Sequence, residues 1–150
     1  MSKAALHRSL SLQIAALVPA AALVIGSAPS GNVNVTVNGL RNAKGFIRAC
    51  ITPNPKDFPD CGHGGARTVS IAATNGAVLS FPNIPAGRYA ISILHDENGD
   101  GRMNKMLMLP KEGFGFSRDA PVRLGPPSFG SAAFDVGAGT VNAQIKVRYM

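Results

Sequence analysis

A strict alternation of apolar and polar side chains constrains this chain more than any other feature of its sequence. Residues 140–149 place every apolar side chain on one face, namely Val141, Ala143, Ile145, Val147 and Tyr149. Residues 32–38 repeat the pattern with Val33, Val35 and Val37. Successive side chains of a β-strand point to opposite faces, so this period predicts half-buried strands. No stretch after residue 30 carries the period of a helix.

Strands of this kind are predicted in seven segments of the chain. They cover residues 32–38, 46–52, 67–72, 77–81, 88–94, 132–136 and 140–149. Turn-forming residues separate them, including the pair Asn75-Gly76, which is typical of a tight hairpin. Short strands at this spacing, without helices, predict an all-β fold. We expect an antiparallel β-sandwich of about seven strands, with immunoglobulin-like or transthyretin-like strand order.

A long loop at 105–130 interrupts the predicted domain, which spans 31–150. Loops of this length are uncommon in a compact domain unless they have a function or pack onto the core. The segment is rich in apolar residues, which favours packing. Its three phenylalanines allow two interpretations. Phe114, Phe116 and Phe129 form either an exposed platform for a glycan or peptide, or anchors that hold the loop on the core.

The first 30 residues are typical of a secretory signal peptide. Lys3 and Arg8 precede an apolar stretch from Leu10 to Ile25, and small residues follow, with cleavage expected before Gly31. The alternative is an uncleaved membrane anchor, which Pro19 and the shortness of the stretch disfavour. No cysteine ends the stretch, so a lipoprotein anchor is not indicated. We expect an exported protein, periplasmic or extracellular, that does not span the membrane after cleavage.

The charge of the remaining chain is moderately basic. Without Lys3 and Arg8, 13 of the 15 basic residues remain against 8 acidic residues, a net charge of +5. These basic residues are scattered and form no run or basic helix, which disfavours nucleic acid as a partner. A basic surface near anionic envelope polymers is the simpler interpretation. The expected partner is an envelope polymer or an envelope protein.

Two cysteines, Cys50 and Cys61, lie in the predicted exported part. An even number of cysteines in an oxidising compartment predicts one disulfide, worth about 2–3 kcal/mol for a loop of this size. A zinc site with His63 and His95 is an alternative that the spacing disfavours. A catalytic thiol would need a partner base, and the sequence indicates none.

An acidic segment follows the strand at 88–94 and resembles the first half of a calcium loop. Asp96, Asn98 and Asp100 stand at alternate positions, with Gly101 next and Asn104 after it. A loop that curls around a cation presents alternate side chains inward, and glycine makes the sharp turn. We therefore predict a weak Ca²⁺ site, the only cofactor expected, with Glu112 as a fifth ligand from the long loop.

A metal-free turn is the alternative interpretation of the acidic segment. Position twelve of the loop, where a calcium loop carries glutamate, is Leu107. Arg102 and Lys105 lie close enough in sequence to neutralise the acidic side chains. In such a turn, Asp and Asn side chains accept hydrogen bonds from their own backbone. The sequence leaves both interpretations open.

Catalytic chemistry is not predicted. A triad of His95, Asp96 and either Ser117 or Ser128 is disfavoured, because adjacent strand residues point to opposite faces. Glu112 has no evident carboxylate partner. We expect a non-catalytic binding or structural module. An enzyme that acts on envelope polymers through Glu112 or His95, and an accessory domain of a larger complex, are the alternatives.

Several segments together resemble a bacterial family, the Domain of Unknown Function 2141 family. They are Val37-Asn-Gly-Leu-Arg41, Gly45-Phe-Ile-Arg48, His95-Asp-Glu-Asn-Gly-Asp-Gly101, Pro110-Lys-Glu-Gly-Phe-Gly-Phe-Ser117 and Leu124-Gly-Pro-Pro-Ser-Phe129. The run from Phe81 to Gly101 also resembles transthyretin-like and carboxypeptidase-regulatory-like sandwiches. The resemblance implies an exported bacterial β-sandwich and no particular activity. Asn104, often Asp in the family, and the following Lys105 depart from its pattern.

Overall fold

The computed structural model describes residues 26, 28–62, 65–102, 105–106 and 109–150. The residues that carry the signal-peptide pattern lie almost entirely outside these ranges, so the signal peptide stays a prediction. Within the described residues, no helix has the length and apolar character needed to cross a membrane.

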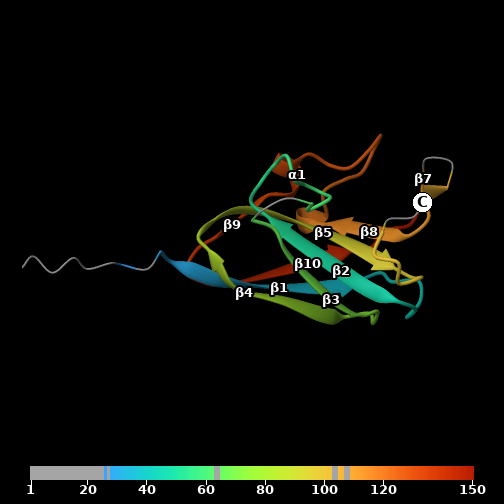
Figure 1. Cartoon of the computed structure of the whole chain (residues 1–150), viewed down its shortest axis with the longest axis horizontal. Coiled ribbons are helices and arrows are strands. Elements are labelled where there is room, and N and C mark those ends of the chain that lie inside the picture. The colour runs from blue at the N-terminus through green and yellow to red at the C-terminus, as the bar shows by residue number, and fades with distance from the viewer. Residues whose placement is uncertain (1–25, 27, 63–64, 103–104, 107–108) are drawn as a thin grey trace, which may run out of the picture.

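Two sheets pack face to face in a sandwich (Figure 1). The first sheet has the order β10 (Gly139–Lys146), β1 (Ser30–Asn38) and β4 (Ala77–Pro85). The second has the order β3 (Arg67–Ala72), β2 (Phe46–Thr52), β5 (Gly87–Asp96) and β8 (Gly113–Phe116), and β9 (Phe134–Val136) also pairs with β5. A separate hairpin joins β6 (Lys105–Met106) and β7 (Leu109–Pro110). The predicted all-β sandwich is confirmed.

One strand pair differs from the antiparallel arrangement that we expected. β1 and β10 run parallel over eight paired residues, from Gly31 beside Gly139 to Asn38 beside Lys146. Parallel neighbours need a long connection between them. Here the connection is the whole domain, because β1 and β10 are its first and last strands. Alternation within each strand does not reveal the direction of its neighbour, so the sequence could not show this pair.

The core between the sheets contains the side chains that the alternation predicted to be inward. β1 contributes Val33, Val35 and Val37, which are fully buried. β2 contributes Ile47, Ala49 and Ile51; β5 contributes Tyr89, Ile91 and Ile93. Side chains at the intervening positions of β2 and β5 point to the opposite face of the second sheet. We call this the outer face, because it is turned away from the first sheet.

The segment 105–130 contains regular structure that we did not expect. β8 lies within it and pairs with β5 (Phe114 opposite Leu94). A Cβ on Gly115 would lie 2.6 Å from Ile145 Cγ2, and one on Gly113 would collide with Val147 and Tyr149. The glycines of Gly-Phe-Gly-Phe therefore form the flat side of a strand that packs directly on β10. The alternation was hidden because glycine is usually read as a turn residue.

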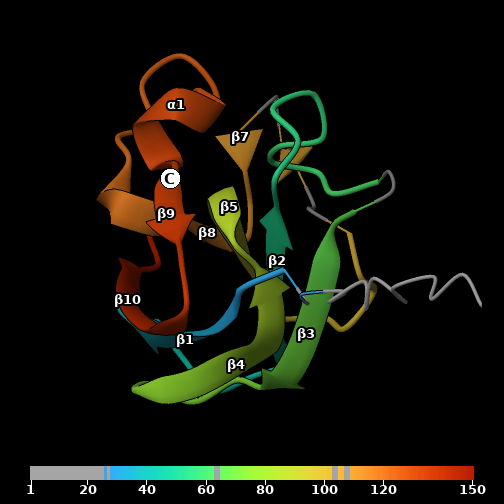
Figure 2. The same cartoon turned by 90° about the vertical axis from the view of Figure 1, so that its left-hand side faces the viewer.

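A third layer covers part of the outer face (Figure 2). It contains the loop after β2 and a short helix α1 (Phe129–Ala132). A 3₁₀ turn η1 (Ser117–Asp119) follows β8 and contacts β10 and α1. The predicted strand 132–136 is shorter than expected, because α1 ends at Ala132 and β9 begins at Phe134. A second apolar cluster holds this layer on the sheet. Its members are Phe58, Ala90, Phe114, Phe116, Ala120, Val122, Phe129 and Ala132.

Candidate functional site

Asp96 ends β5 and organises the turn that follows it, residues 96–102, which we call the acidic turn. Its Oδ1 accepts hydrogen bonds from the backbone N–H groups of Gly99 and Asp100, at 2.8 and 3.1 Å. Its Oδ2 accepts from the backbone N–H of Gly101 at 2.9 Å. Gly99 and Gly101 have φ of 75° and 74°, a conformation that glycine adopts without strain. One carboxylate therefore closes the whole turn.

A strong ion pair joins Asp96 to the neighbouring strand. Arg48 Nε on β2 donates to Asp96 Oδ2 at 2.5 Å, and the Asp96 side chain is fully buried. Burial favours the neutral acid and raises the pKa of Asp96, but the hydrogen bonds from Arg48, Gly101 and Gly99 outweigh burial. The net effect is a pKa below the ordinary value. Asp96 is therefore held as a carboxylate.

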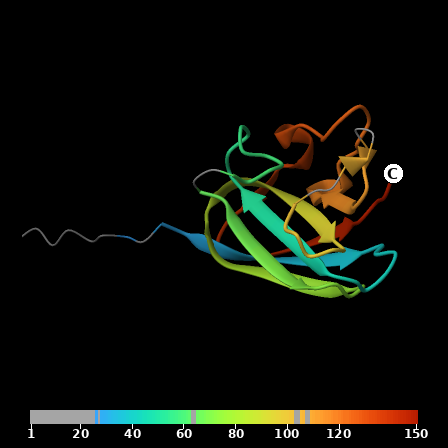
Figure 3. The same cartoon turned by 45° about the vertical axis from the view of Figure 1, so that its right-hand side comes forward.

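Glu97 faces the β1–β2 turn, which lies at the same end of the sandwich as the acidic turn (Figure 3). It accepts hydrogen bonds from the side chains of Arg41 and Asn42. The hydrogen bond from Arg41 lowers the pKa of Glu97 more than burial raises it. The Arg41 guanidinium also lies 4.4 Å from the centre of the Tyr149 ring. These contacts hold three separate segments of the chain together.

The predicted metal ligands are only partly assembled. Asp96, Asp100 and Glu112 each bring a carboxylate oxygen within 4.8 Å of the others, although Glu112 is 12 residues away from the nearest of them in sequence. Asn98 donates to Asp100 Oδ2 at 3.0 Å, which keeps it in the same turn. Asn104 lies outside the described residues. The geometry is compatible with a cation, and equally with the metal-free turn in which Arg48 supplies the positive charge.

His95 has a structural position inside the fold. Its side chain is fully buried, and both ring nitrogens are engaged, Nδ1 with Tyr149 Oη at 2.6 Å and Nε2 with the Lys44 carbonyl at 2.8 Å. A carbonyl can only accept, so Nε2 carries a proton. Asp96 points to the opposite face, as expected from their adjacency. His95 and Asp96 therefore do not form a catalytic dyad.

The two serines considered as nucleophiles also have structural partners. Ser117 is fully buried, and its hydroxyl donates to the Ala132 carbonyl at 2.6 Å and accepts from the Ile91 N–H at 2.9 Å. Ser128 caps the start of α1 through the N–H of Ser131. The ring nitrogens of His95 bond to Tyr149 and to the Lys44 carbonyl, and to neither serine.

Cys50 and Cys61 form a disulfide, with their Cα atoms 6.4 Å apart. This pairing removes both thiolates from the alternative zinc site, and His63 lies outside the described residues. The bridge ties the loop after β2 to the outer face. Ser92 Oγ also donates to the Pro59 carbonyl at 2.7 Å, and the Phe58 ring packs edge-on against Phe116. The loop is therefore fixed at several points.

A groove of about 1030 Å³ runs along the outer face. Its floor comes from β2, β3, β5 and β8. Its walls are the disulfide loop on one side and the segment 122–126 on the other, with Gly101 of the acidic turn beside it. Its lining includes Arg48, Cys50, Asp60, Cys61, Thr68, Ser70, Ser92, Leu94, Phe114, Phe116, Arg123, Leu124 and Met150.

The groove and Arg48 are the features that the sequence analysis missed. The sequence predicts no role for Arg48 beyond its place in the family segment Gly45-Phe-Ile-Arg48. The register places Phe46 opposite Asp96, so Arg48 sits one diagonal position away. That relation needs the pairing of β2 with β5, which the sequence does not specify. Phe114 and Phe116, by contrast, are only 4% exposed and serve as anchors rather than as a platform.

These features define a class: a small, disulfide-bridged β-sandwich with a carboxylate-closed turn and a groove on its outer face. The chain belongs to the DUF2141 family, described as an uncharacterized protein conserved in bacteria, whose model matches residues 35–144. No curated protein matches the sequence.

Solved structures similar to the chain include the pilus-presented adhesin Spy0125 (Cpa). One crystal form of the adhesin is 15% identical with a TM-score of 0.35, over 79% of this chain and 27% of the adhesin chain. A mutant of the same adhesin gives 15% identity and a TM-score of 0.32, over 83% and 28%. The chain thus spans little more than a quarter of the adhesin. A likeness at this level says nothing about what the chain binds.

Proposed function

We propose that this protein is an exported, non-catalytic binding module of the bacterial cell envelope, and that it holds an extended segment of an envelope protein in the outer-face groove. The observation that carries the proposal is the groove itself, in which the wall formed by the disulfide loop is tied to the floor. A disulfide and the Ser92–Pro59 hydrogen bond hold one wall. Fixed walls reduce the ordering cost of binding.

The lining of the groove favours a protein segment over a glycan. Sugar binding commonly uses exposed aromatic faces, but Phe114 and Phe116 are buried in the second cluster. The rim instead carries the fully exposed Leu124, with Arg123 and Asp60 nearby. An apolar contact flanked by charges of both signs is typical of protein interfaces. A groove of this volume also exceeds what a small metabolite needs.

Export is supported by the disulfide and by the N-terminal sequence. Disulfides persist in oxidising compartments and are rare in the bacterial cytosol. A non-catalytic role is supported by the hydrogen bonds of His95 and Ser117, which commit both side chains to the fold.

The groove is tested by comparing two substitutions of exposed apolar residues. Leu124→Asp changes the groove rim, whereas Val78→Asp changes β4 on the other sheet and serves as the matched control. In size-exclusion chromatography of periplasmic extracts, wild type and Val78→Asp should elute in a complex larger than the purified protein alone. Leu124→Asp should elute as the free protein. Elution of wild type at its own mass, or equal effects of both substitutions, would overturn the proposal.

A second function, weak Ca²⁺ binding at the acidic turn, is favoured by one observation. Glu112 is 3% exposed, yet its carboxylate reaches those of Asp96 and Asp100. Calcium prefers six to eight oxygen ligands, so waters and backbone carbonyls would complete the shell. Bound Ca²⁺ would tie the acidic turn to the residue that precedes β8, next to the groove.

A further inference from the structure

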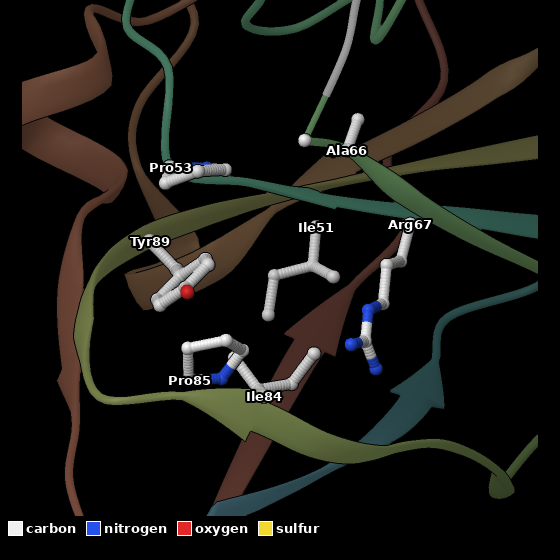
Figure 4. A pocket seen from close by; sticks show the side chains of 8 residues that line it. Ile51, Pro53, Ala66, Arg67, Ile84, Pro85 and Tyr89 are labelled. Carbon is white, nitrogen blue, oxygen red and sulfur yellow. The ribbon is translucent and has the colours of Figure 1, made fainter. Parts of the chain in front are cut away.

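A smaller pocket of about 390 Å³ opens between the two sheets, at the end of the sandwich opposite the acidic turn (Figure 4). It lies where β2 ends, β3 begins, and the chain passes from β4 to β5. Among the strands that the structure describes, β3 pairs only with β2 and β4 only with β1, so the sandwich is open between these two edge strands. We call this cavity the end pocket. It shares no lining residue with the outer-face groove.

The walls of the end pocket are mostly apolar. Ile51 and Ile84 are each 1% exposed and lie on opposite sides of it, one from each sheet. Pro53 and Pro85 extend these apolar walls. An apolar cavity with a few polar groups is the usual form of a small-molecule site, and this volume falls at the lower end of the range.

Tyr89 supplies a polar group at the end pocket. Its side chain is only 7% exposed, and its hydroxyl faces the pocket. Among the described residues, no hydrogen-bond partner accompanies this hydroxyl. Buried tyrosines usually satisfy the O–H group with a hydrogen bond. No buried side-chain nitrogen or oxygen atom of the described residues lacks a partner, so this hydroxyl is reached by water. A ligand acceptor in the pocket would replace that water.

Arg67 supplies a positive charge at the same pocket. Its Nη1 donates to the Pro82 carbonyl at 2.7 Å, which directs the side chain from β3 toward β4 (Figure 4). A guanidinium has five N–H donors, so most of them remain available. No carboxylate in the described part of the chain forms an ion pair with Arg67. Arg67, which is exposed, and Tyr89 therefore bring donors that are not fully engaged by the protein to one apolar cavity.

We propose that the end pocket binds a small monocarboxylate with a compact apolar body. The carboxylate has two acceptor oxygens and no donor, which matches the guanidinium of Arg67 and the hydroxyl of Tyr89. The apolar body fits between Ile51, Ile84 and Pro85. Two sources share this chemistry: a free branched or aromatic acid, and the C-terminal residue of a peptide.

The test uses the purified, disulfide-bonded protein and the methyl NMR signals of Ile51 and Ile84. The probes are isovalerate and N-acetylvaline, each compared with its neutral amide. Both amides should bind at least about 10-fold more weakly than the acids, because a neutral amide forms no charge-assisted pair with Arg67. Binding of isovalerate alone would identify a free acid as the ligand class, and binding of N-acetylvaline alone a peptide terminus. Unmoved methyl signals at about 10 mM acid, or equal binding of acids and amides, would overturn the proposal.

Three substitutions make the test specific. Arg67→Gln should weaken acid binding about 10-fold, and Tyr89→Phe should weaken it about 3- to 10-fold, since each removes one donor. Arg88→Gln is the control, because Arg88 is exposed, pairs with Asp135 and does not line the pocket. Equal loss of binding in Arg88→Gln and Arg67→Gln would mean that general surface charge, and not the end pocket, attracts the acid.

Discussion

Arg48 and Asp96 form an ion pair across two neighbouring strands, with Nε of Arg48 2.5 Å from Oδ2 of Asp96. The pair is diagonal in the β2–β5 register, on the outer face. The same carboxylate accepts three backbone N–H groups of the acidic turn. The direction in which the chain leaves β5 therefore depends on one buried side chain and on the strand beside it.

Stability should fall in acid because of Asp96. Its pKa in the folded protein lies below the ordinary value, so its contribution is complete above the pKa of the unfolded chain and is lost as the pH falls toward the folded pKa. Glu97 acts in the same direction. We expect the free energy of unfolding, from urea titrations, to be constant between about pH 5 and pH 7 and to decrease below about pH 4.

The substitution Asp96→Asn tests whether this carboxylate causes the loss of stability in acid. At pH 7 it should lower the free energy of unfolding by about 2–3 kcal/mol, because the buried ion pair is lost. It should also reduce the loss of stability in acid. Asp135→Asn, which alters an exposed pair with Arg88, should cost less than about 0.5 kcal/mol. An acid dependence as steep in Asp96→Asn as in wild type would contradict the role of this carboxylate.

The disulfide should contribute measurably to stability. Cys50 and Cys61 are 11 positions apart, and a loop of that size corresponds to about 2–3 kcal/mol. The double variant Cys50→Ser/Cys61→Ser should therefore unfold at lower urea concentration than wild type, and reductant should change wild type only. Thiol counting on protein released from the periplasm should find no reactive cysteine. Two reactive thiols in that fraction would refute the bridge.

Calcium should raise the melting temperature if the acidic turn binds it. We expect a Kd of about 10⁻⁴–10⁻³ M, typical of extracellular sites. Glu112→Gln and Asp100→Asn should each weaken binding, because each removes a carboxylate of the cluster. Asp60→Asn, on the disulfide loop, is the control. A melting temperature that millimolar Ca²⁺ leaves unchanged would assign the acidic turn to the metal-free state, in which Arg48 supplies the positive charge.

The glycine side of β8 should tolerate no side chain. A Cβ at Gly115 would lie 2.6 Å from Ile145 Cγ2 and 3.0 Å from the Lys146 carbonyl. Gly115→Ala should therefore destabilise the protein by about 1–3 kcal/mol, as overpacking does. Gly130→Ala is the control, since nothing lies within 4 Å of a Cβ there. Equal stability of the two variants would mean that β8 does not pack on β10 in the way described.

Much of the sandwich could be predicted because one face of each strand is buried. Val33, Val35 and Val37 carry that period without interruption, and both faces of β5 are apolar, as a central strand requires. The parallel partner of β1 could not be predicted, because the alternation within a strand is the same for a parallel and an antiparallel neighbour. β8 escaped prediction because glycine stands at the positions that pack on β10.

Only part of the candidate site could be predicted from the sequence, for a related reason. The spacing along the chain identified Asp96, Asn98 and Asp100, which are close in sequence. Glu112 was predicted because it is an acidic residue in the long apolar loop. Arg48, Arg67 and Tyr89 acquire their roles from strands that are distant in sequence. Their partners follow from sheet register and from the gap between edge strands, which no spacing along the chain specifies.

The most direct test of the groove is photo-crosslinking in living cells. A photoreactive residue at position 124 or 70, both exposed in the groove, should give a discrete protein adduct. The same residue at position 78 or 80, on the exposed face of β4, should give none. An adduct confined to the groove positions is the result that we predict. No adduct at any position, or the same adduct at all four, would contradict the assignment of the outer face as the binding surface.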